Sequence, residues 1–149
     1  MNRRSFVSPI GPLSLAEEGG RIVRLDFGEA KGERAATPLL REAESQLRAY
    51  FAERLKKFDL PLDPRGTEFQ RKAWNALLEI PYGETRSYGE IAARIGNPKA
   101  CRAVGMANNR NPISIIVPCH RVVGADGSLV GYGGGLGVKK FLLELESKA

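Results

Sequence analysis

Cys119 and His120 are neighbouring residues whose side chains could carry out covalent chemistry. Cys119 follows Pro118 after a short apolar run, and His120 is the only histidine among the 149 residues. A thiolate is a strong, soft nucleophile, and an imidazole that removes the thiol proton can generate it. Adjacent residues need not meet at the sulfur and the ring nitrogen, so the dipeptide alone favours the plainer interpretation of a buried, inert thiol.

Composition narrows the class of protein. The chain is 42% hydrophobic and 27% charged, which suits one domain or two small ones with a buried core. Two cysteines and one histidine are too few for a disulfide scaffold or for a zinc site without carboxylates, so we expect a free thiol, no metal and no cofactor. No apolar run is long enough to span a membrane and no signal segment is evident, so we expect a soluble, cytoplasmic protein.

The positive charge is concentrated in one stretch. The net charge is +6, which favours a polyanionic partner. Between residues 86 and 121 the single acid is Glu90, whereas six residues are basic: Arg86, Arg94, Lys99, Arg102, Arg110 and Arg121.

Residues 1–60 predict a small α/β domain. Residues 5–28 alternate in a strand-like way and are interrupted by turn residues such as Gly19-Gly20, which is typical of an antiparallel sheet. Thr37 and Pro38 predict the start of a helix. Its buried face would carry Leu40, Ala43, Leu47, Phe51 and Leu55. Pro61, Pro64 and Gly66 predict an unpacked linker over about 57–66, followed by a second domain over 65–149.

The second domain is predicted to be mostly helical. Thr67 with Gln70 and Ser87 with Glu90 match the capping-box pattern at two helix starts. The first of these helices would bury Phe69, Ala73, Trp74, Leu77 and Ile80. Gly96 would end the second, and Asn97-Pro98 would open a third that runs to about Ala107.

The second and third of these helices have helix-turn-helix spacing. The third is a candidate recognition helix. Its basic residues are Lys99, Arg102 and Arg110, and its small ones are Ala100, Ala103 and Val104. Cys101 is expected to pack inward.

The surroundings of Cys119 predict short elements. Residues 113–117 predict a buried strand, and Ala125-Asp126-Gly127 predicts a hairpin turn between Val122-Val123 and Leu129-Val130. A glycine-rich loop over 131–135 would face the cysteine. The final helix, from about residue 138 to 147, would turn Phe141, Leu142 and Leu145 inward.

The sequence around Cys119 resembles the acceptor signature of the O6-alkylguanine-DNA alkyltransferases, also called methylated-DNA–protein-cysteine methyltransferases. The likeness begins with Pro118-Cys119-His120-Arg121-Val122-Val123 and continues without gaps from residue 80 to 146. It includes Gly96-Asn97-Pro98-Lys99-Ala100, Arg102-Ala103-Val104-Gly105, Asn111-Pro112, Gly131-Tyr132, Gly134-Gly135-Leu136 and Lys139. Ser8-Pro9-Ile10-Gly11-Pro12 is similar to the start of bacterial members. The resemblance implies a ribonuclease H-like first domain.

The same resemblance implies an irreversible, single-turnover repair reaction. Cys119 would take the alkyl group from oxygen 6 of guanine in DNA and keep it as a thioether, with alkylated thymine left open as a second substrate. His120 would accept the thiol proton through a water, Glu146 would polarise the imidazole, and Asn111 would brace the turn.

The resemblance also implies how DNA is bound. Tyr88 would press on the phosphate beside the lesion, and Arg102 would fill the gap left by the flipped nucleotide, with its helix in the minor groove. Ala103, Lys99, Arg110 and Arg121 complete the expected DNA-binding set. The base pocket would be shaped by Val122, Tyr132, Gly133 and Gly134. The partner would be double-stranded DNA that contains alkylated guanine, bound by a monomer, with cooperativity along DNA left open.

Three other functions fit parts of the sequence. An alkyltransferase-like protein that binds lesions without repair would resemble this chain but would lack the acceptor cysteine. A helix-turn-helix regulator would leave Cys119, His120 and Glu146 without a purpose. A thiol hydrolase would release its acyl intermediate with water and so would turn over many times.

Overall fold

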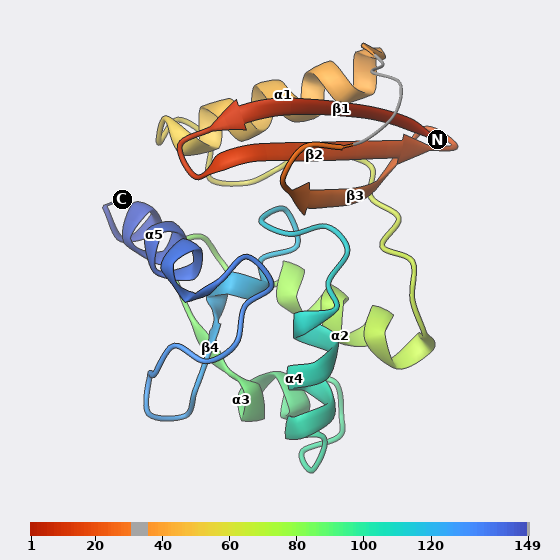
Figure 1. Cartoon of the computed structure of the whole chain (residues 1–149). Coiled ribbons are helices and arrows are strands. Elements are labelled where there is room, and N and C mark those ends of the chain that lie inside the picture. The colour runs from red at the N-terminus through yellow and green to blue at the C-terminus, as the bar shows by residue number, and fades with distance from the viewer. Residues whose placement is uncertain (31–35, 149) are drawn as a thin grey trace. The chain divides into compact units, whose positions relative to one another are not determined.

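A computed structural model describes residues 1–30 and 36–148 of the chain. They form two compact units, each visible in Figure 1. The first contains Met1–Arg65 together with Pro112–Ile116, and the second contains Gly66–Asn111 and the residues from Val117 onward. The mixed α/β class, with strands first and helices after, is confirmed. None of the helices in the described part is long and apolar enough to cross a membrane.

The first unit is built on a three-stranded antiparallel sheet in the order β1-β2-β3. Its strands are β1 (Asn2–Ser8), β2 (Gly11–Glu18) and β3 (Arg21–Phe27). Gly19 and Gly20 join β2 to β3 with φ angles of 61° and 76°. Two successive positive φ angles suit the tight turn of a hairpin, and glycine adopts them without a steric penalty.

Helix α1 (Pro38–Phe51) packs on the sheet (Figure 1). The Thr37 side chain accepts a hydrogen bond from the backbone N–H of Leu40, which confirms the predicted cap. The predicted burial of Phe51 and Leu55 is wrong. Tyr50 is buried in their place, because the helix ends at Phe51 and Leu55 follows in a loop.

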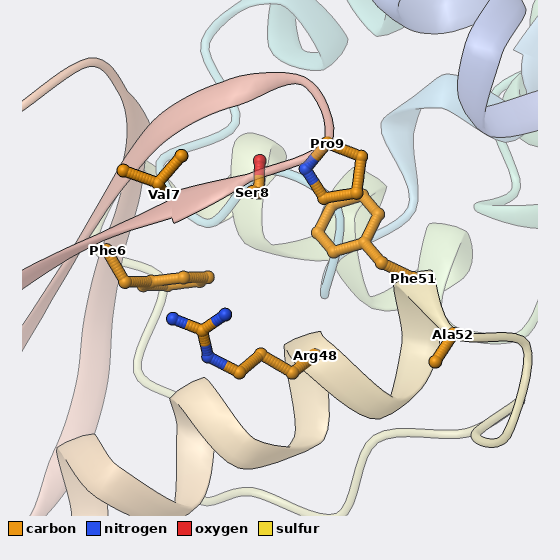
Figure 2. Close-up of a pocket in the computed structure, with 7 residues that line it drawn as sticks. All are labelled: Phe6, Val7, Ser8, Pro9, Arg48, Phe51 and Ala52. Carbon is orange, nitrogen blue, oxygen red and sulfur yellow. The ribbon is translucent and has the colours of Figure 1, made fainter.

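The partly exposed Phe51 lines a surface pocket of the first unit, together with Pro9 and Arg48 (Figure 2). The Arg48 guanidinium stacks over the ring of Phe6, 5.2 Å from its centroid. This cation–π contact joins α1 to β1, as does the ion pair between Arg4 and Glu44.

The predicted linker and the predicted strand after residue 112 both differ from expectation, and both make backbone contacts with β3. The linker is not free of the sheet: the Ile22 N–H donates to the carbonyl of Pro61 over 2.8 Å, and the Asp63 N–H donates to the carbonyl of Ile22 over 2.8 Å. The apolar residues of 113–117 are buried as predicted, but the segment forms turns rather than a strand. Ile113 makes only an isolated bridge to Leu25, and Ile115 has a φ of 70°. That conformation costs a β-branched residue about 1–2 kcal/mol and turns the chain away from the sheet.

The second unit contains the helices α2 (Glu68–Leu78), α3 (Tyr88–Arg94), α4 (Cys101–Asn109) and α5 (Leu136–Ser147). Both predicted capping boxes form, at the starts of α2 and α3. Trp74 is buried, and its indole N–H donates to the carbonyl of Ala107 over 2.9 Å, which ties α2 to α4. Helices α3 and α4, the two helices expected to form a helix-turn-helix, pack against each other.

Several boundaries in this unit differ from the sequence-based expectation. Helix α4 begins at Cys101 rather than at Asn97-Pro98, because the Ala100 N–H bonds back to the carbonyl of Asn97 and closes a separate turn. Strand β5 (Val122–Val123) pairs in parallel with β4 (Arg86–Ser87), so the hairpin predicted with Leu129-Val130 does not form. A tight turn is nevertheless present, closed by a hydrogen bond from the Gly127 N–H to the carbonyl of Gly124.

Helix α5 buries a different set of side chains from the one expected. Leu142 and Leu145 face inward as predicted, but Phe141 is 37% exposed. Lys139 and Glu146 are buried instead. Their positions, three residues before and four residues after Leu142, place all three side chains on one face of the helix. This face brings a cation and a carboxylate into the interior of the second unit.

Candidate active site

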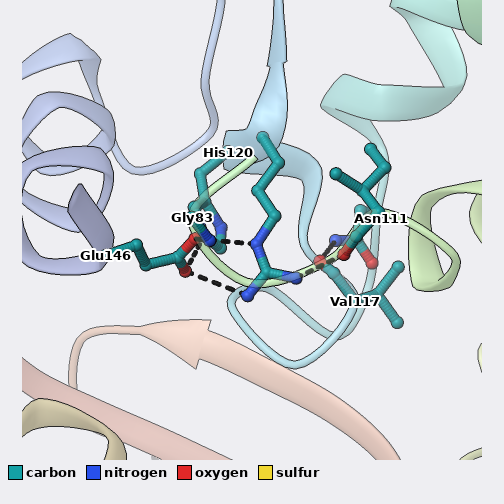
Figure 3. A network of polar contacts seen from close by, with 7 residues as sticks. Gly83, Asn111, Val117, His120 and Glu146 are labelled. Atoms are coloured by element: carbon teal, nitrogen blue, oxygen red, sulfur yellow. Dashed lines mark hydrogen bonds and ion pairs between the residues drawn. The ribbon is translucent and has the colours of Figure 1, made fainter. Parts of the chain in front are cut away.

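Cys119 begins a single turn of 3-10 helix, Cys119–Arg121, immediately before β5. Two amides from the end of α4 and the residues after it hold this turn. The Asn108 side-chain N–H donates to the carbonyl of Cys119 over 3.2 Å. The Asn111 side-chain N–H donates to the carbonyl of Val117 over 2.8 Å (Figure 3). Cys119 itself is only 3% exposed. The thiol therefore lies on a turn that is fixed from two sides.

His120 and Arg121, the two residues after Cys119, form a buried polar cluster with Glu146. Figure 3 shows His120 against Glu146. The Nε2 atom of His120 lies 2.7 Å from Oε2 of Glu146. The Arg121 guanidinium donates to both oxygens of the same carboxylate, from Nε to Oε1 over 2.8 Å and from Nη2 to Oε2 over 3.1 Å. The Gly83 N–H donates to Oε1 over 3.3 Å. Helix α5 thus supplies one carboxylate to an imidazole, a guanidinium and a backbone amide.

The hydrogen bonds of His120 indicate its tautomer. A carboxylate can only accept a hydrogen bond, so Nε2 carries the ring proton. The Nδ1 atom is buried and has no hydrogen-bond partner among the residues that the structure describes. Nδ1 therefore presents a lone pair, which is the arrangement that a general base requires.

The electrostatics of the cluster favour a neutral resting state. Burial raises the pKa of the Cys119 thiol to about 11, and this rise remains although the Asn111 side chain, the charge of Lys139 and the Tyr132 hydroxyl all favour the thiolate. Burial also lowers the pKa of His120, with the charges of Arg121 and Lys139 acting in the same direction and Glu146 against them. At neutral pH the site therefore holds a protonated thiol and a neutral imidazole.

A loop after β5 brings Tyr132 to the cysteine. The Tyr132 hydroxyl interacts with the Cys119 sulfur, and the Gly135 N–H closes a turn onto the carbonyl of Tyr132 over 3.0 Å. Buried Lys139 donates to the carbonyls of Val130 and Gly131 over 3.0 and 3.3 Å. Val122 of β5 is fully buried. Gly133 and Gly134 lie within the same turn and carry no side chain.

Comparison with known proteins gives the family. The model described as "6-O-methylguanine DNA methyltransferase, DNA binding domain" matches residues 68–148, and the one described as "6-O-methylguanine DNA methyltransferase, ribonuclease-like domain" matches residues 1–64. The chain belongs to the 6-O-methylguanine DNA methyltransferase family.

Similar proteins agree with this family over almost the whole chain. A methylated-DNA–protein-cysteine methyltransferase of Methanosarcina acetivorans is 62% identical over 148 residues, which covers 95% of each chain. The crystal structure of Mycobacterium tuberculosis OGT in complex with DNA is 54% identical, with a TM-score of 0.92, and the match covers 99% of this chain and 94% of that one. An S. pombe protein in complex with damaged DNA containing O6-carboxymethylguanine is 38% identical over 55% of this chain and 78% of that one, with a TM-score of 0.50.

Five residues that the family resemblance assigns to DNA binding are exposed or partly exposed in the second unit. Arg102 and Ala103 are exposed on α4, and Lys99 and Arg110 are exposed just before and just after this helix. Val104 of the same helix faces the core, so it is not available to a partner. Tyr88 is half-buried at the start of α3, and its hydroxyl donates to the carbonyl of Val130 over 2.9 Å. Cys101 is exposed, so the expectation that it packs inward is wrong.

Arg121 does not lie with the exposed basic residues. Its side chain is 7% exposed, and its guanidinium is occupied by Glu146 and, from Nη1 over 2.7 Å, by the carbonyl of Ile80. The prediction that Arg121 contacts DNA is therefore wrong, and Arg121 instead binds Glu146 and the Ile80 carbonyl within the site. Arg86 pairs with Glu84, and Arg94 pairs with Glu79. Within the described residues, Lys99, Arg102 and Arg110 are the bases of this stretch that form no ion pair.

Sequence reasoning gave no role to three residues that support the site. Asn108 holds the Cys119 carbonyl, Lys139 holds the loop carbonyls, and Gly83 donates to Glu146. A signal for two of them exists, because Lys139 and Asn108 fall at helical spacing on the buried faces of their helices. A polar residue on such a face must be hydrogen-bonded, and this requirement points to a structural or chemical role.

Proposed function

We propose that this protein repairs alkylated DNA by transferring the alkyl group from oxygen 6 of guanine to the sulfur of Cys119. The observation that carries the proposal is the state of His120, the residue that follows the buried thiol of Cys119: Glu146 holds its Nε2 atom, and its buried Nδ1 atom has no hydrogen-bond partner among the described residues. The family supports it, because relatives that cover the same length are named methylated-DNA–protein-cysteine methyltransferases. The activity is that of EC 2.1.1.63.

The reaction begins with removal of the thiol proton. Because burial holds the pKa of Cys119 near 11, no preformed thiolate is present at neutral pH, and a base must act when substrate is bound. Nδ1 of His120 accepts the proton through a bridging water, and the resulting imidazolium is stabilised by Glu146. The thiolate then attacks the saturated carbon from the side opposite to oxygen 6.

One bond forms and one breaks in this displacement. The sulfur–carbon bond forms as the carbon–oxygen bond breaks, and the bonding electrons leave with oxygen 6 of guanine. The guanine anion takes up the proton that the thiol lost, so guanine is restored and Cys119 becomes a thioether. A thioether is not hydrolysed as an acyl intermediate is, so each protein molecule repairs one lesion. Alkylated thymine presents the same type of carbon on oxygen 4, and we propose it as a second substrate.

Access to oxygen 6 requires the nucleotide to leave the base stack. Flipping costs a few kcal/mol, and a poorly paired lesion lowers this cost. We propose that a monomer lays α4 in the minor groove, where Arg102 fills the vacated space and Ala103 permits close approach. Tyr88 presses on the neighbouring phosphate, and Lys99 and Arg110 bind the flanking backbone. The flipped base enters beneath the loop of Tyr132, Gly133 and Gly134, against Val122.

The deciding experiment is mass spectrometry of the protein after incubation with a duplex that contains O6-methylguanine. We expect the peptide of Cys119 to gain one methyl group per molecule, with no further product when DNA is in excess. Cys101→Ser is the matched control and should react normally, because Cys101 is the exposed cysteine. Cys119→Ala should bind DNA and gain no methyl group. A wild-type protein that binds the duplex without gaining mass would be a lesion sensor, and steady turnover would indicate a hydrolase.

A further inference from the structure

Arg121 is the donor with the most contacts in the buried cluster, and the proposed reaction has so far given it no role. It binds both oxygens of Glu146 and, through its remaining terminal nitrogen, the carbonyl of Ile80. Its guanidinium also lies 5.8 Å from the ring centroid of Tyr82. A planar guanidinium held at two carboxylate oxygens and one carbonyl has a single orientation. Because both of its oxygens are bound by this guanidinium, the Glu146 carboxylate is fixed with Oε2 toward His120.

The charge of Arg121 matters as much as its geometry. An unopposed buried carboxylate beside Nε2 would favour a proton on the other ring nitrogen, because the imidazolium–carboxylate pair would be strongly attractive at low dielectric. An imidazolium cannot accept the proton of the thiol. A guanidinium on the same carboxylate reduces this attraction, so the imidazole remains a base until the thiol gives up its proton.

We propose that Arg121 is a positioning residue for alkyl transfer: it aligns Glu146 with Nε2 of His120 and keeps the resting imidazole neutral, with Nδ1 available to the thiol. Its effect on transfer rests on the proposed function, but its effect on the histidine does not. The contacts that support it are the two hydrogen bonds from Arg121 to Glu146, the 2.7 Å contact between Glu146 and His120, and the burial of all three side chains.

Three charged groups act on the imidazole of His120. Glu146 is in direct contact, whereas Arg121 and Lys139 oppose its protonation. The Cys119 thiol is neutral at moderate pH. Lys139 is anchored independently on the carbonyls of Val130 and Gly131. A substitution of Arg121 therefore leaves Lys139 in place, so a change in the titration of His120 reports the loss of Arg121.

The single histidine of the chain makes a direct test possible. Nitrogen-15 NMR of the free protein shows one pair of imidazole nitrogens, whose shifts distinguish the two neutral tautomers and the cation. In the wild type we expect the Nε2–H tautomer at neutral pH and a titration midpoint below the usual value of about 6.5. In Arg121→Gln we expect the midpoint to rise by about 1 unit or more. Arg65→Gln removes a cation from an exposed ion pair and should leave the midpoint unchanged.

The rate of methyl transfer provides the second readout. In Arg121→Gln the acid limb of the pH–rate profile should move to higher pH together with the NMR midpoint, whereas the dissociation constant for DNA should stay within about twofold of the wild type, since Arg121 is buried. Arg121→Lys keeps the positive charge but loses the planar group that binds both oxygens of Glu146. We expect it to retain the low NMR midpoint and to transfer about tenfold more slowly, because orientation of the base is lost.

The two proposals fail in different ways. A folded Arg121→Gln variant whose histidine titrates like that of the wild type overturns the role of Arg121, whatever the fate of DNA repair. If Arg121→Gln does not fold, Arg121→Lys is the test. A wild-type transfer rate in Arg121→Lys would show that the two-point contact with Glu146 is not needed, and would overturn the positioning role. A wild-type protein that transfers no methyl group overturns the proposed function, yet the NMR comparison still stands.

Discussion

The hydroxyl of Tyr88 and the ammonium of Lys139 both donate to the carbonyl of Val130, over 2.9 and 3.0 Å. Tyr88 opens α3 of the helix-turn-helix pair, and Lys139 belongs to α5. The backbone just before Tyr132 is therefore held by the two elements at once. If Tyr88 turns to a DNA phosphate, as we propose, this carbonyl keeps only its bond to Lys139. Binding of DNA would then loosen the loop whose Tyr132 interacts with Cys119.

Removal of the Tyr88 hydroxyl tests whether α3 and the loop at Val130 are coupled. Tyr88→Phe keeps the ring and loses the hydroxyl, so we expect the free energy of unfolding to fall by about 0.5–1.5 kcal/mol. Amide hydrogen exchange over residues 130–135 should accelerate in the free protein, while exchange in the strands β1 to β3 should not change. Equal protection of the loop in Tyr88→Phe and wild type would show that Lys139 alone is sufficient.

Alkaline pH should destabilise the protein through Cys119. The folded-state pKa of this thiol is raised to about 11 from a value of 9.0, so the unfolded chain loses the proton first as the pH rises. Stability is then lost between about pH 9 and pH 11, by up to about 3 kcal/mol over two pH units. Urea unfolding at several pH values measures this loss. Cys119→Ser should flatten that part of the profile, whereas an identical profile for Cys119→Ser would mean that other groups are responsible.

The two cysteines should react with iodoacetamide at very different rates. Cys101 is exposed at the start of α4, whereas Cys119 is buried and its pKa is raised, so its thiolate is scarce. At pH 8 we expect peptide mapping to find Cys101 modified first, with Cys119 at least about tenfold slower, and equal rates only in denaturant. Preferential labelling of Cys119 in the folded protein would contradict the neutral resting state of the thiol.

Salt should weaken DNA binding in proportion to the phosphates that the protein contacts. Lys99 and Arg110 are exposed and form no ion pair within the described residues, so each can neutralise one phosphate. Lys99→Gln and Arg110→Gln should each reduce the slope of log affinity against log salt by about 0.9. Arg121→Gln, at a buried position, should not change it. Fluorescence anisotropy over a salt series makes the measurement, and a slope unaltered in both Lys99→Gln and Arg110→Gln would remove these two residues from the interface.

Local sequence signals predicted the fold best. The two capping boxes, the Thr37 cap and the Gly19-Gly20 turn depend on residues within a few positions of each other, and all of them form. Residues 113–117 show the limit of this reasoning. Their apolar character predicted burial correctly, but the turn at Ile115 depends on a single backbone bridge to Leu25, far away in the sequence.

The reacting residues of the site could be predicted from the sequence, but the positions of its buried cations could not. Cys119, His120 and Glu146 could be named through the family signature, and the structure places His120 against Glu146. Arg121 could not be assigned correctly, because a basic residue in a basic stretch is most often exposed. Its burial depends on Glu146 and Ile80, which are contributed by distant segments. The same reasoning explains why Lys139 carried no predicted role.

The inclusion of Pro112–Ile116 in the first unit has a consequence for biosynthesis. β3 receives Ile113 as a neighbour only after more than two thirds of the chain has left the ribosome. Until then the nascent sheet carries an open edge at Leu25, to which a second nascent chain could add a strand. The first unit to be translated is thus completed by a segment made much later, and a fragment that stops at residue 65 should aggregate where the full chain does not.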